Sequence, residues 1–190
     1  WLEKDITLGN ALTDMYVKCG MISKAQEVLE GLDGKDIVSW NALISGYLDN
    51  GCGMEALQCF RQLQDKGILG DSGTFVLALK ACSIIGAADE SQDIHAFICM
   101  KGLETDLIIG NAIVEVYAKC GFLGKAHEVF NDLPVQNIVS WTTLIAGYVQ
   151  NGHSDQALNC FDQMQLKGLM PNAVTFACIL KACGSIGAID

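Results

Sequence analysis

Residues 36–47 read DIVSWNALISGY, and residues 137–148 read NIVSWTTLIAGY. The two stretches lie 101 positions apart and differ at few places, one of which is Asn41 against Thr142. The same shift aligns LGNALTDMYVKCG (8–20) with IGNAIVEVYAKCG (109–121), and TFVLALKAC (74–82) with TFACILKAC (175–183). Similarity at a fixed period is typical of repeat proteins, so we interpret the chain as a duplicated array.

Each copy contains three smaller units. Their helix-opening segments start near Ile6, Ile37 and Ser72 in the first copy, and near Leu107, Ile138 and Ala173 in the second. The spacings between these starts are 31, 35 and 35 residues. This unequal but recurring spacing indicates three kinds of unit that follow one another in a fixed order along the chain.

The second unit indicates what each unit is made of. Apolar residues recur with helical spacing in two stretches, first at Leu43, Ile44, Tyr47 and Leu48, then at Ala56, Leu57, Phe60 and Leu63. Asn50-Gly51 ends the first stretch and Lys66-Gly67 the second. A single helix pair cannot bury its apolar faces, whereas stacked pairs form a continuous core. The sequence therefore predicts an all-α fold, an α-solenoid of stacked helix-turn-helix repeats.

The composition suits a folded helical array. The chain has 190 residues, of which 51% are hydrophobic, and two prolines. A net charge of −10 argues against phosphate attraction as the main source of any affinity for nucleic acid. No apolar run approaches the roughly 20 residues of a membrane span. The first residues, WLEKDITLGN, do not have the pattern of a targeting peptide, so we expect any such segment to lie outside this sequence.

Nine cysteines are present, and no two are spaced C-x-x-C. Three pairs recur at the repeat distance: Cys19 with Cys120, Cys59 with Cys160, and Cys82 with Cys183. We interpret them as small buried hydrophobic residues of a protein from a reducing compartment. A metal site and redox chemistry are the open alternatives.

Catalytic motifs are missing from the sequence. His95, His127 and His153 begin no H-x-E, and without C-x-x-C there is no zinc site of the deaminase kind. The sequence also lacks a phosphate-binding loop and a G-x-S-x-G segment. We predict no enzyme activity, no catalytic residues, no metal and no cofactor.

The segments NAL…Y-x-KCG, VSW…LI-x-GY and TF…LKAC, in units of 31, 35 and 35 residues, resemble the pentatricopeptide repeat family, and within it the PLS subclass of land plants. The resemblance implies a right-handed α-solenoid superhelix. It divides the chain into the end of an L repeat (1–5), then S (6–36), P (37–71), L (72–106), S (107–137), P (138–172) and a partial L repeat (173–190). Tetratricopeptide repeats are the nearest alternative, but they have a uniform period of about 34 residues and a W-x2-L-G-x2-Y pattern that this chain lacks.

The family resemblance implies binding of single-stranded RNA, one base per repeat, by the fifth and last residues of each repeat. The pairs are Asn10 with Asp36 and Asn41 with Asp71 for uridine, Asn111 with Asn137 for cytidine, and Thr142 with Asn172 for adenosine. The L repeats, with Val76 and Asp106 in one and Ala177 in the other, are expected to select weakly. The implied target is 5′-U-U-n-C-A-3′. Asp36, Asp71 and Asp106 also suit helix N-caps, which is the structural alternative.

Two further positions follow from the same resemblance. The second residue of each repeat forms an apolar wall beside the base, and Val38, Ile108 and Val139 fit this role, whereas Gly73 departs from it. Lys18 and Lys119 match a position that touches the RNA backbone. Each lysine also suits a solvated helix end, where the helix dipole favours a cation.

The resemblance implies a segment of a plant organelle factor that recognises sites of C-to-U RNA editing. We expect it in a chloroplast or mitochondrion, with single-stranded organellar RNA as its partner and without DNA or membrane partners. A small accessory editing factor of the MORF/RIP type is a possible partner at the L repeat. The alternative function is a protein-interaction solenoid.

Overall fold

The computed structural model describes residues 6–32 and 36–187, and within these ranges the chain forms eleven helices and no strand. The predicted end of a preceding repeat at 1–5 lies outside the described residues. The chain divides into two compact units, 1–87 and 88–190, which are described one at a time. The prediction of an all-α solenoid of helix pairs is confirmed.

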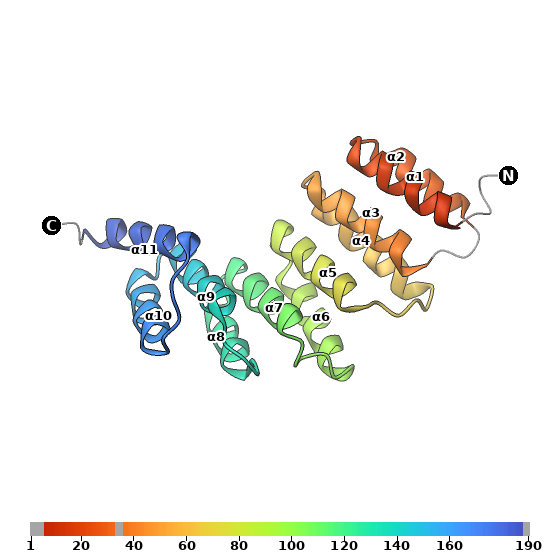
Figure 1. Ribbon diagram of the computed structural model, residues 1–190. Helices are drawn as coiled ribbons and strands as arrows, with labels where there is room; N and C mark the ends of the chain where they lie inside the picture. Colours follow the sequence, from red (N-terminus) through yellow and green to blue (C-terminus); the bar gives the residue numbers. More distant parts are fainter. Residues whose placement is uncertain (1–5, 33–35, 188–190) are drawn as a thin grey trace. The chain divides into compact units, whose positions relative to one another are not determined.

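The first unit has two layers of helices (Figure 1). Helices α1, α3 and α5 lie side by side in one layer, and α2 and α4 pack against them from the other. The bounds are α1 Ile6–Lys18, α2 Ile22–Gly31, α3 Ile37–Asp49, α4 Gly53–Asp65 and α5 Ser72–Ile85. Neighbouring odd-numbered helices are therefore the first helices of successive repeats, which places equivalent side chains next to one another.

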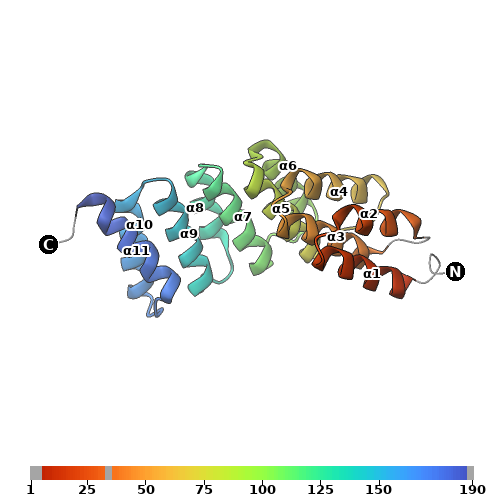
Figure 2. The same ribbon diagram turned by 90° about the horizontal axis from the view of Figure 1, so that it is seen from above.

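The second unit repeats this arrangement (Figure 2). Helices α7, α9 and α11 form the first layer, α8 and α10 pack against it, and α6 packs against α7. The bounds are α6 Ala88–Met100, α7 Leu107–Lys119, α8 Leu123–Asp132, α9 Ile138–Gln150, α10 Ser154–Leu166 and α11 Ala173–Ile186. The six odd-numbered helices begin at the residues where the sequence units begin.

The core lies between the two layers of each unit. In α3, Leu43 and Ile44 are buried, and Tyr47 and Leu48 are half-buried. The apolar stripe of α4 is buried along its whole length: Ala56, Leu57, Phe60 and Leu63. The helical spacing in the sequence thus identified core residues of both helices. Gly51, with φ of +73°, provides the left-handed turn after α3 that a side chain would disfavour.

Two glycines allow the first-layer helices to approach closely. A Cβ atom added at Gly46 of α3 would lie 2.5 Å from a methyl of Val17 on α1. At the equivalent place in the second unit, a Cβ atom at Gly147 of α9 would lie 2.5 Å from the Cβ of Ala118 on α7. The distance between neighbouring repeats therefore depends on having no side chain at these positions.

The interpretation of the cysteines is correct in part. Cys59, Cys82 and Cys160 are buried, as expected of small apolar residues. Cys19 is exposed and Cys120 half-buried, so the interpretation is wrong for this pair, and Cys183 on α11 is also only half-buried. For Cys19 and Cys120 the physical reason is that each follows the last residue of a helix and lies in the turn, beyond the packed layers.

The structure shows two absences among the residues it describes. None of the described helices has the length and apolar character needed to cross a membrane. Within the same residues, no group of three or more histidine, cysteine, aspartate or glutamate side chains gathers in a way that could hold a metal ion.

Candidate nucleic-acid interface

The last residue of each complete repeat caps the first helix of the next repeat. Asp36 accepts a hydrogen bond from the Ser39 backbone N–H at 2.9 Å, and Asp71 accepts one from that of Thr74 at 2.8 Å. Asp106, Asn137 and Asn172 cap α7, α9 and α11 in the same way. The structural alternative raised for the aspartates, an N-cap, is therefore correct. The capping role leaves part of each side chain for other contacts.

In the first unit, the fifth residue of a repeat contacts its last residue. The amide Nδ2 of Asn10 donates to Asp36 Oδ1 at 3.3 Å, and Asn41 Nδ2 donates to Asp71 Oδ1 at 3.2 Å. The members of each pair come from two neighbouring first-layer helices, one from the first turns and one from the cap. The residues predicted to read one base together are thus adjacent in both repeats.

The second unit links its pairs differently. Thr142 and Asn172 are joined through Thr175, whose Oγ1 lies 2.7 Å from Thr142 Oγ1 and donates to Asn172 Oδ1 at 2.9 Å. For Asn111 and Asn137, no direct hydrogen bond is found within the described residues. The Oδ1 of Asn111 is buried and has no partner there. The four predicted pairs are therefore not geometrically equivalent.

Hydrogen bonds favour the charged form of Asp36 and Asp71, the two capping aspartates of the first unit. The backbone N–H of Ser39 is the main cause of a lowered pKa at Asp36, and it outweighs the opposing effect of burial. Burial acts to raise the pKa of Asp71, but hydrogen bonds from Thr74 and Asn41 together lower it by more. At neutral pH both carboxylates are acceptors only.

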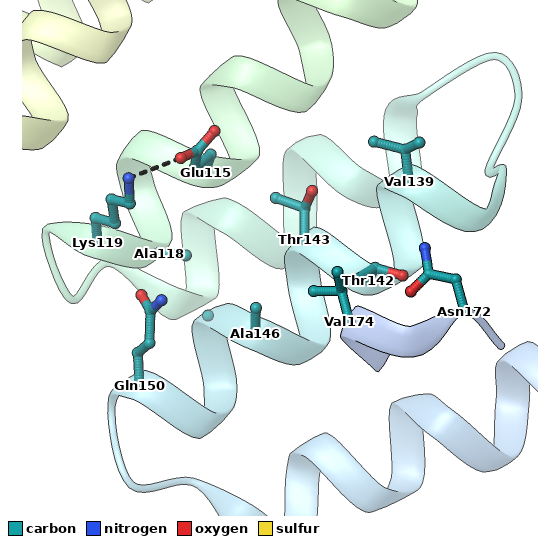
Figure 3. Close-up of a pocket in the computed structure, with 11 residues that line it drawn as sticks. Glu115, Ala118, Lys119, Val139, Thr142, Thr143, Ala146, Gln150, Asn172 and Val174 are labelled. Atoms are coloured by element: carbon teal, nitrogen blue, oxygen red, sulfur yellow. Dashed lines mark ion pairs between the residues drawn. The ribbon is translucent and has the colours of Figure 1, made fainter. Parts of the chain in front are cut away.

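A cavity of about 340 Å³ lies beside Thr142 and Asn172 (Figure 3). Val139 and Val174, the second residues of two successive repeats, also line it. The remaining lining residues are Glu115, Ala118, Lys119, Thr143, Ala146, Gly147 and Gln150. The cavity combines apolar walls with hydroxyl and amide groups, which is the chemistry that a nucleobase requires from its two faces and its edge.

The second-position residues are apolar and exposed. Val38, Ile108 and Val139 expose 57%, 68% and 51% of their surface. A Cβ atom added at Gly73 would lie 3.2 Å from Asp71 Oδ1 and 3.9 Å from Asn41 Nδ2. The second residue of a repeat therefore stands beside the pair of the preceding repeat. At the Asn41–Asp71 pair, this wall is missing.

The two predicted backbone lysines are paired with acids on their own helices. Lys18 lies 2.7 Å from Asp14, and Lys119 lies 2.7 Å from Glu115, which also lines the cavity. Sequence reasoning missed these acids, although both stand four residues before the lysine, a spacing that favours ion pairs on a helix. The ion pair cancels much of the positive charge that a phosphate group would meet.

The repeats predicted to be of the L type lack the fifth-position polar group. Val76 is half-buried, and Ala177 is exposed on α11. Asp106 accepts hydrogen bonds from the backbone N–H groups of Ile108 and Ile109, at 2.8 and 3.3 Å. Weak base selection by these repeats stays a prediction.

The chain is thus an all-α repeat protein, and four of its first-layer helices carry a polar fifth residue: Asn10, Asn41, Asn111 and Thr142. The model of the PPR repeat family matches residues 35–83 and 136–185, and the model of the PPR repeat matches residues 10–37 and 111–138. The chain therefore belongs to the pentatricopeptide repeat (PPR) family.

Relatives from Arabidopsis thaliana cover nearly the whole chain. Pentatricopeptide repeat-containing protein At4g38010 is 40% identical over 96% of this chain. The relative At1g15510, named chloroplastic, is 35% identical over 99%, and At3g09040, named mitochondrial, is 36% identical over 96%. The chain spans 33%, 22% and 18% of the length of these three proteins.

Solved structures show the same fold. The crystal structure of PPR10 from maize superposes with a TM-score of 0.77 at 23% identity, over 96% of this chain and 27% of that one. PPR10 in complex with an 18-nt psaJ RNA element gives a TM-score of 0.76 at 19% identity, over 94% and 28%.

Proposed function

We propose that this chain binds single-stranded RNA in a sequence-specific manner, with one base at each S and P repeat and the target 5′-U-U-n-C-A-3′. The observation that carries the proposal is the joining of the fifth residue of a repeat to its last residue in three of the four pairs, beside exposed apolar residues. The joining is direct for Asn10–Asp36 and Asn41–Asp71, and it passes through Thr175 for Thr142–Asn172. The relatedness to PPR10, which has been crystallised with an RNA element, supports the same function. The first repeat faces the 5′ end in this proposal.

The Asn41–Asp71 pair suits uracil. One N–H of Asn41 is donated to Asp71 Oδ1, which leaves the second N–H of that amide as a donor. The other oxygen of Asp71 supplies an acceptor. Uracil offers an N–H donor between two carbonyl acceptors on its edge, so one donor and one acceptor match it. The same argument applies to Asn10 and Asp36.

The Thr142–Asn172 pair suits adenine. The backbone N–H and the hydroxyl of Thr175 both donate to Oδ1 of Asn172, at 2.8 and 2.9 Å. This leaves the Nδ2 amide hydrogens of Asn172 as donors toward the cavity. Adenine presents an acceptor, N1, next to its N6 amino donor. In the proposed complex Asn172 donates to N1, and the Thr142 oxygen accepts from the amino group.

In the Asn111–Asn137 pair the last residue carries an amide, whereas in the Asn41–Asp71 pair it carries a carboxylate. The Oδ1 of Asn137 accepts from the backbone N–H groups of Val139 and Ser140, at 2.9 and 3.1 Å, so its Nδ2 is the donor available to a base. Cytosine N3 is an acceptor where uracil N3 carries a hydrogen. Replacement of the acceptor by a donor is therefore the change that exchanges uridine for cytidine.

The recurring order of repeats of 31, 35 and 35 residues along the chain supports the PLS subclass and a role in C-to-U editing. In this role the chain holds RNA on the 5′ side of a cytidine, and a deaminase from another segment or protein performs the reaction. The relatives named chloroplastic and mitochondrial support an organellar location. An accessory protein of the MORF/RIP type docking at residues 72–106 is the second candidate, favoured by the apolar fifth residue Val76.

Fluorescence anisotropy with short RNAs tests the proposal. The chain is titrated with 5′-UUACA-3′ between identical flanks, and with the same RNA carrying A as its second base. The double variant Asn41→Thr with Asp71→Asn is titrated with both. A preference for U that the double variant converts into a preference for A supports one base per repeat. The absence of any preference, with tight binding to an accessory editing protein, assigns the function to the L repeat instead.

A further inference from the structure

Buried hydroxyl groups contact the residues proposed to read bases. The hydroxyl of Thr74 lies 2.8 Å from Asn41 Oδ1 and 2.8 Å from Asp71 Oδ1. Ser39 makes the equivalent contacts with Asn10 and Asp36 in the repeat before. Ser39 and Thr74 are fully buried. Each is the third residue of its own repeat, and each contacts the fifth and last residues of the repeat before it.

The hydroxyl determines which way the Asn41 amide faces. Asp71 has only acceptors, so the Nδ2 of Asn41 must face it, and Oδ1 must face a donor. Thr74 carries such a donor, because its single hydroxyl hydrogen is within reach of Asn41 Oδ1 and of Asp71 Oδ1, each at 2.8 Å. The Thr74 oxygen accepts from the Asp71 backbone N–H at 3.2 Å. With both ends of the amide held, one N–H of Asn41 keeps a constant direction. A group held in this way offers a base one hydrogen-bonding pattern instead of two.

In the second unit, the hydroxyl of Thr175 orients the hydroxyl hydrogen of Thr142. Thr175 has a single hydroxyl hydrogen, and either oxygen can be the donor in its short contact with Thr142. When Thr175 donates to Asn172 Oδ1, the contact with Thr142 is a donation from Thr142 to Thr175. The Thr142 oxygen then faces the cavity as an acceptor only. An acceptor at that place suits the amino group of adenine and opposes the O6 carbonyl of guanine.

The contact varies along the chain. Ser140 donates to Asn137 at 3.2 Å, but the adjacent Asn111 has no partner for its buried Oδ1 among the described residues. Ile109 occupies the third position after the L repeat, is fully buried and has no hydroxyl. The repeat at 72–106, whose fifth residue Val76 is apolar, is therefore followed by a repeat whose third residue, Ile109, is also apolar.

We infer that the hydroxyl-bearing third residue of the following repeat is a positioning residue for base selection. Each base is then specified by three side chains across a repeat boundary: the fifth, the last and the next third. This inference rests on the proposed RNA binding. It assigns Ser39, Thr74 and Thr175 a role in specificity without contact with RNA.

The test compares Thr74→Val, which keeps the shape of the side chain and removes the hydroxyl, with Thr74→Ser, which keeps the hydroxyl. Affinities are measured for RNAs that carry U, C or A as the second base of 5′-UUACA-3′. In Thr74→Val we expect the preference for U to fall by about tenfold, the value of one well-placed hydrogen bond to a base edge. Thr74→Ser should retain the preference, and selection at the last base should be unchanged in both variants.

A purely structural role gives a different result. Loss of the cap contact alone would weaken binding of all RNAs equally and lower the melting temperature, with the ratio between bases unchanged. That result in Thr74→Val would overturn the inference while leaving the proposed function intact. If the unsubstituted chain shows no base preference, the proposed function itself fails, and the positioning role fails with it.

Thr175→Val provides a second, independent site. Removal of this hydroxyl frees the proton of Thr142 to point into the cavity, where it can donate to guanine O6. We expect the preference for A over G at the last base to fall by about tenfold, with the second base unaffected. An unchanged ratio between A and G in Thr175→Val contradicts the inference.

Discussion

The side-chain amide of Asn41 donates a hydrogen bond to the carboxylate of Asp71 over 3.2 Å, although the two residues stand 30 positions apart. They meet because α3 and α5 are neighbours in the first layer and Asp71 caps the start of α5. Chemical change at either residue therefore alters a shared site. Two side chains that belong to one repeat thus form one hydrogen-bonded unit.

Substitution of Asp71 should separate its two roles. In Asp71→Asn the helix cap is kept, since Asn137 and Asn172 cap equivalent helices. The acceptor facing the base becomes a donor, so we expect the second base preference to change from U to C at nearly constant stability. Asp71→Ala removes cap and reader together, and should lower the free energy of unfolding by about 0.5–2 kcal/mol. Denaturant unfolding and RNA titration measure the two effects separately.

Glu115 should weaken RNA binding by competing for Lys119. The two side chains form an ion pair of 2.7 Å at the cavity, so removal of the acid frees the lysine for a phosphate. In Glu115→Gln we expect a few-fold higher affinity and a salt dependence steeper by about 0.7 in log–log slope, the value of one phosphate contact on a single strand. Glu128→Gln removes the same charge from an exposed site on α8 and serves as the control. Equal gains in both variants would point to net charge alone.

Gly73→Val should add the missing wall beside the Asn41–Asp71 pair. Valine stands at the same position in the second copy, as Val174, and is compatible with the capped helix start there. The added side chain would approach Asp71 Oδ1, so the carboxylate must shift by a few tenths of an ångström. We expect higher affinity for RNAs of every sequence at constant preference for U, measured by anisotropy. Weaker binding would show that the gap at Gly73 is needed.

Acid should destabilise the second unit through His95. Burial and, secondarily, the charge of Lys125 lower its pKa, while its Nδ1 contacts the Tyr117 hydroxyl at 2.9 Å. A lowered folded pKa means that the unfolded chain binds the proton first. Stability is therefore complete above about pH 6.5, the unfolded value, and is lost as pH falls from there toward the folded pKa.

Denaturant unfolding between pH 7.5 and pH 5 checks this expectation. In His95→Gln the decrease attributable to His95 should disappear, because glutamine does not titrate. Gln26 makes the same kind of hydrogen bond to Tyr47 at 2.8 Å, so the packing can be kept. A variant with the full acid sensitivity of the unsubstituted chain would exclude His95 as its source.

Much of the fold was predictable because it depends on local signals. Helix starts follow from caps and apolar spacing, and helix ends follow from glycines such as Gly51. The contact between Asn41 and Asp71 was not predictable from local chemistry, since it requires the distance between two stacked helices. The hydroxyl of Thr74 was missed for the same reason. Its sequence signal, a serine or threonine three residues after Asp or Asn, is also that of an ordinary helix cap.

Exposure was harder to predict than helix position. Cys19 recurs as Cys120, and this recurrence predicts a buried residue, yet Cys19 is exposed in a turn after α1. Recurrence shows that a position matters in both copies without showing whether it faces the core. The pairing of Glu115 with Lys119, by contrast, was available from their spacing along one helix.

Gly147 should set the spacing on which the cavity depends. In Gly147→Ala the new methyl would lie 2.5 Å from the Cβ of Ala118, so α7 and α9 must move apart. Overpacking of this kind costs about 1–3 kcal/mol, more than the gain in helix propensity. We expect lower stability together with weaker binding of RNA at the last base, since both residues line the cavity.

Gly124→Ala is the matched control, because a Cβ atom there meets nothing within 4 Å. It lies in α8 and should stabilise the chain by up to about 1 kcal/mol through helix propensity alone. The double variant Ala118→Gly with Gly147→Ala moves the methyl to the opposite helix and should recover much of the lost stability and binding. Denaturant unfolding and titration of all four proteins decide the matter. Equal stability of Gly147→Ala and the unsubstituted chain would show that the two helices separate at no cost.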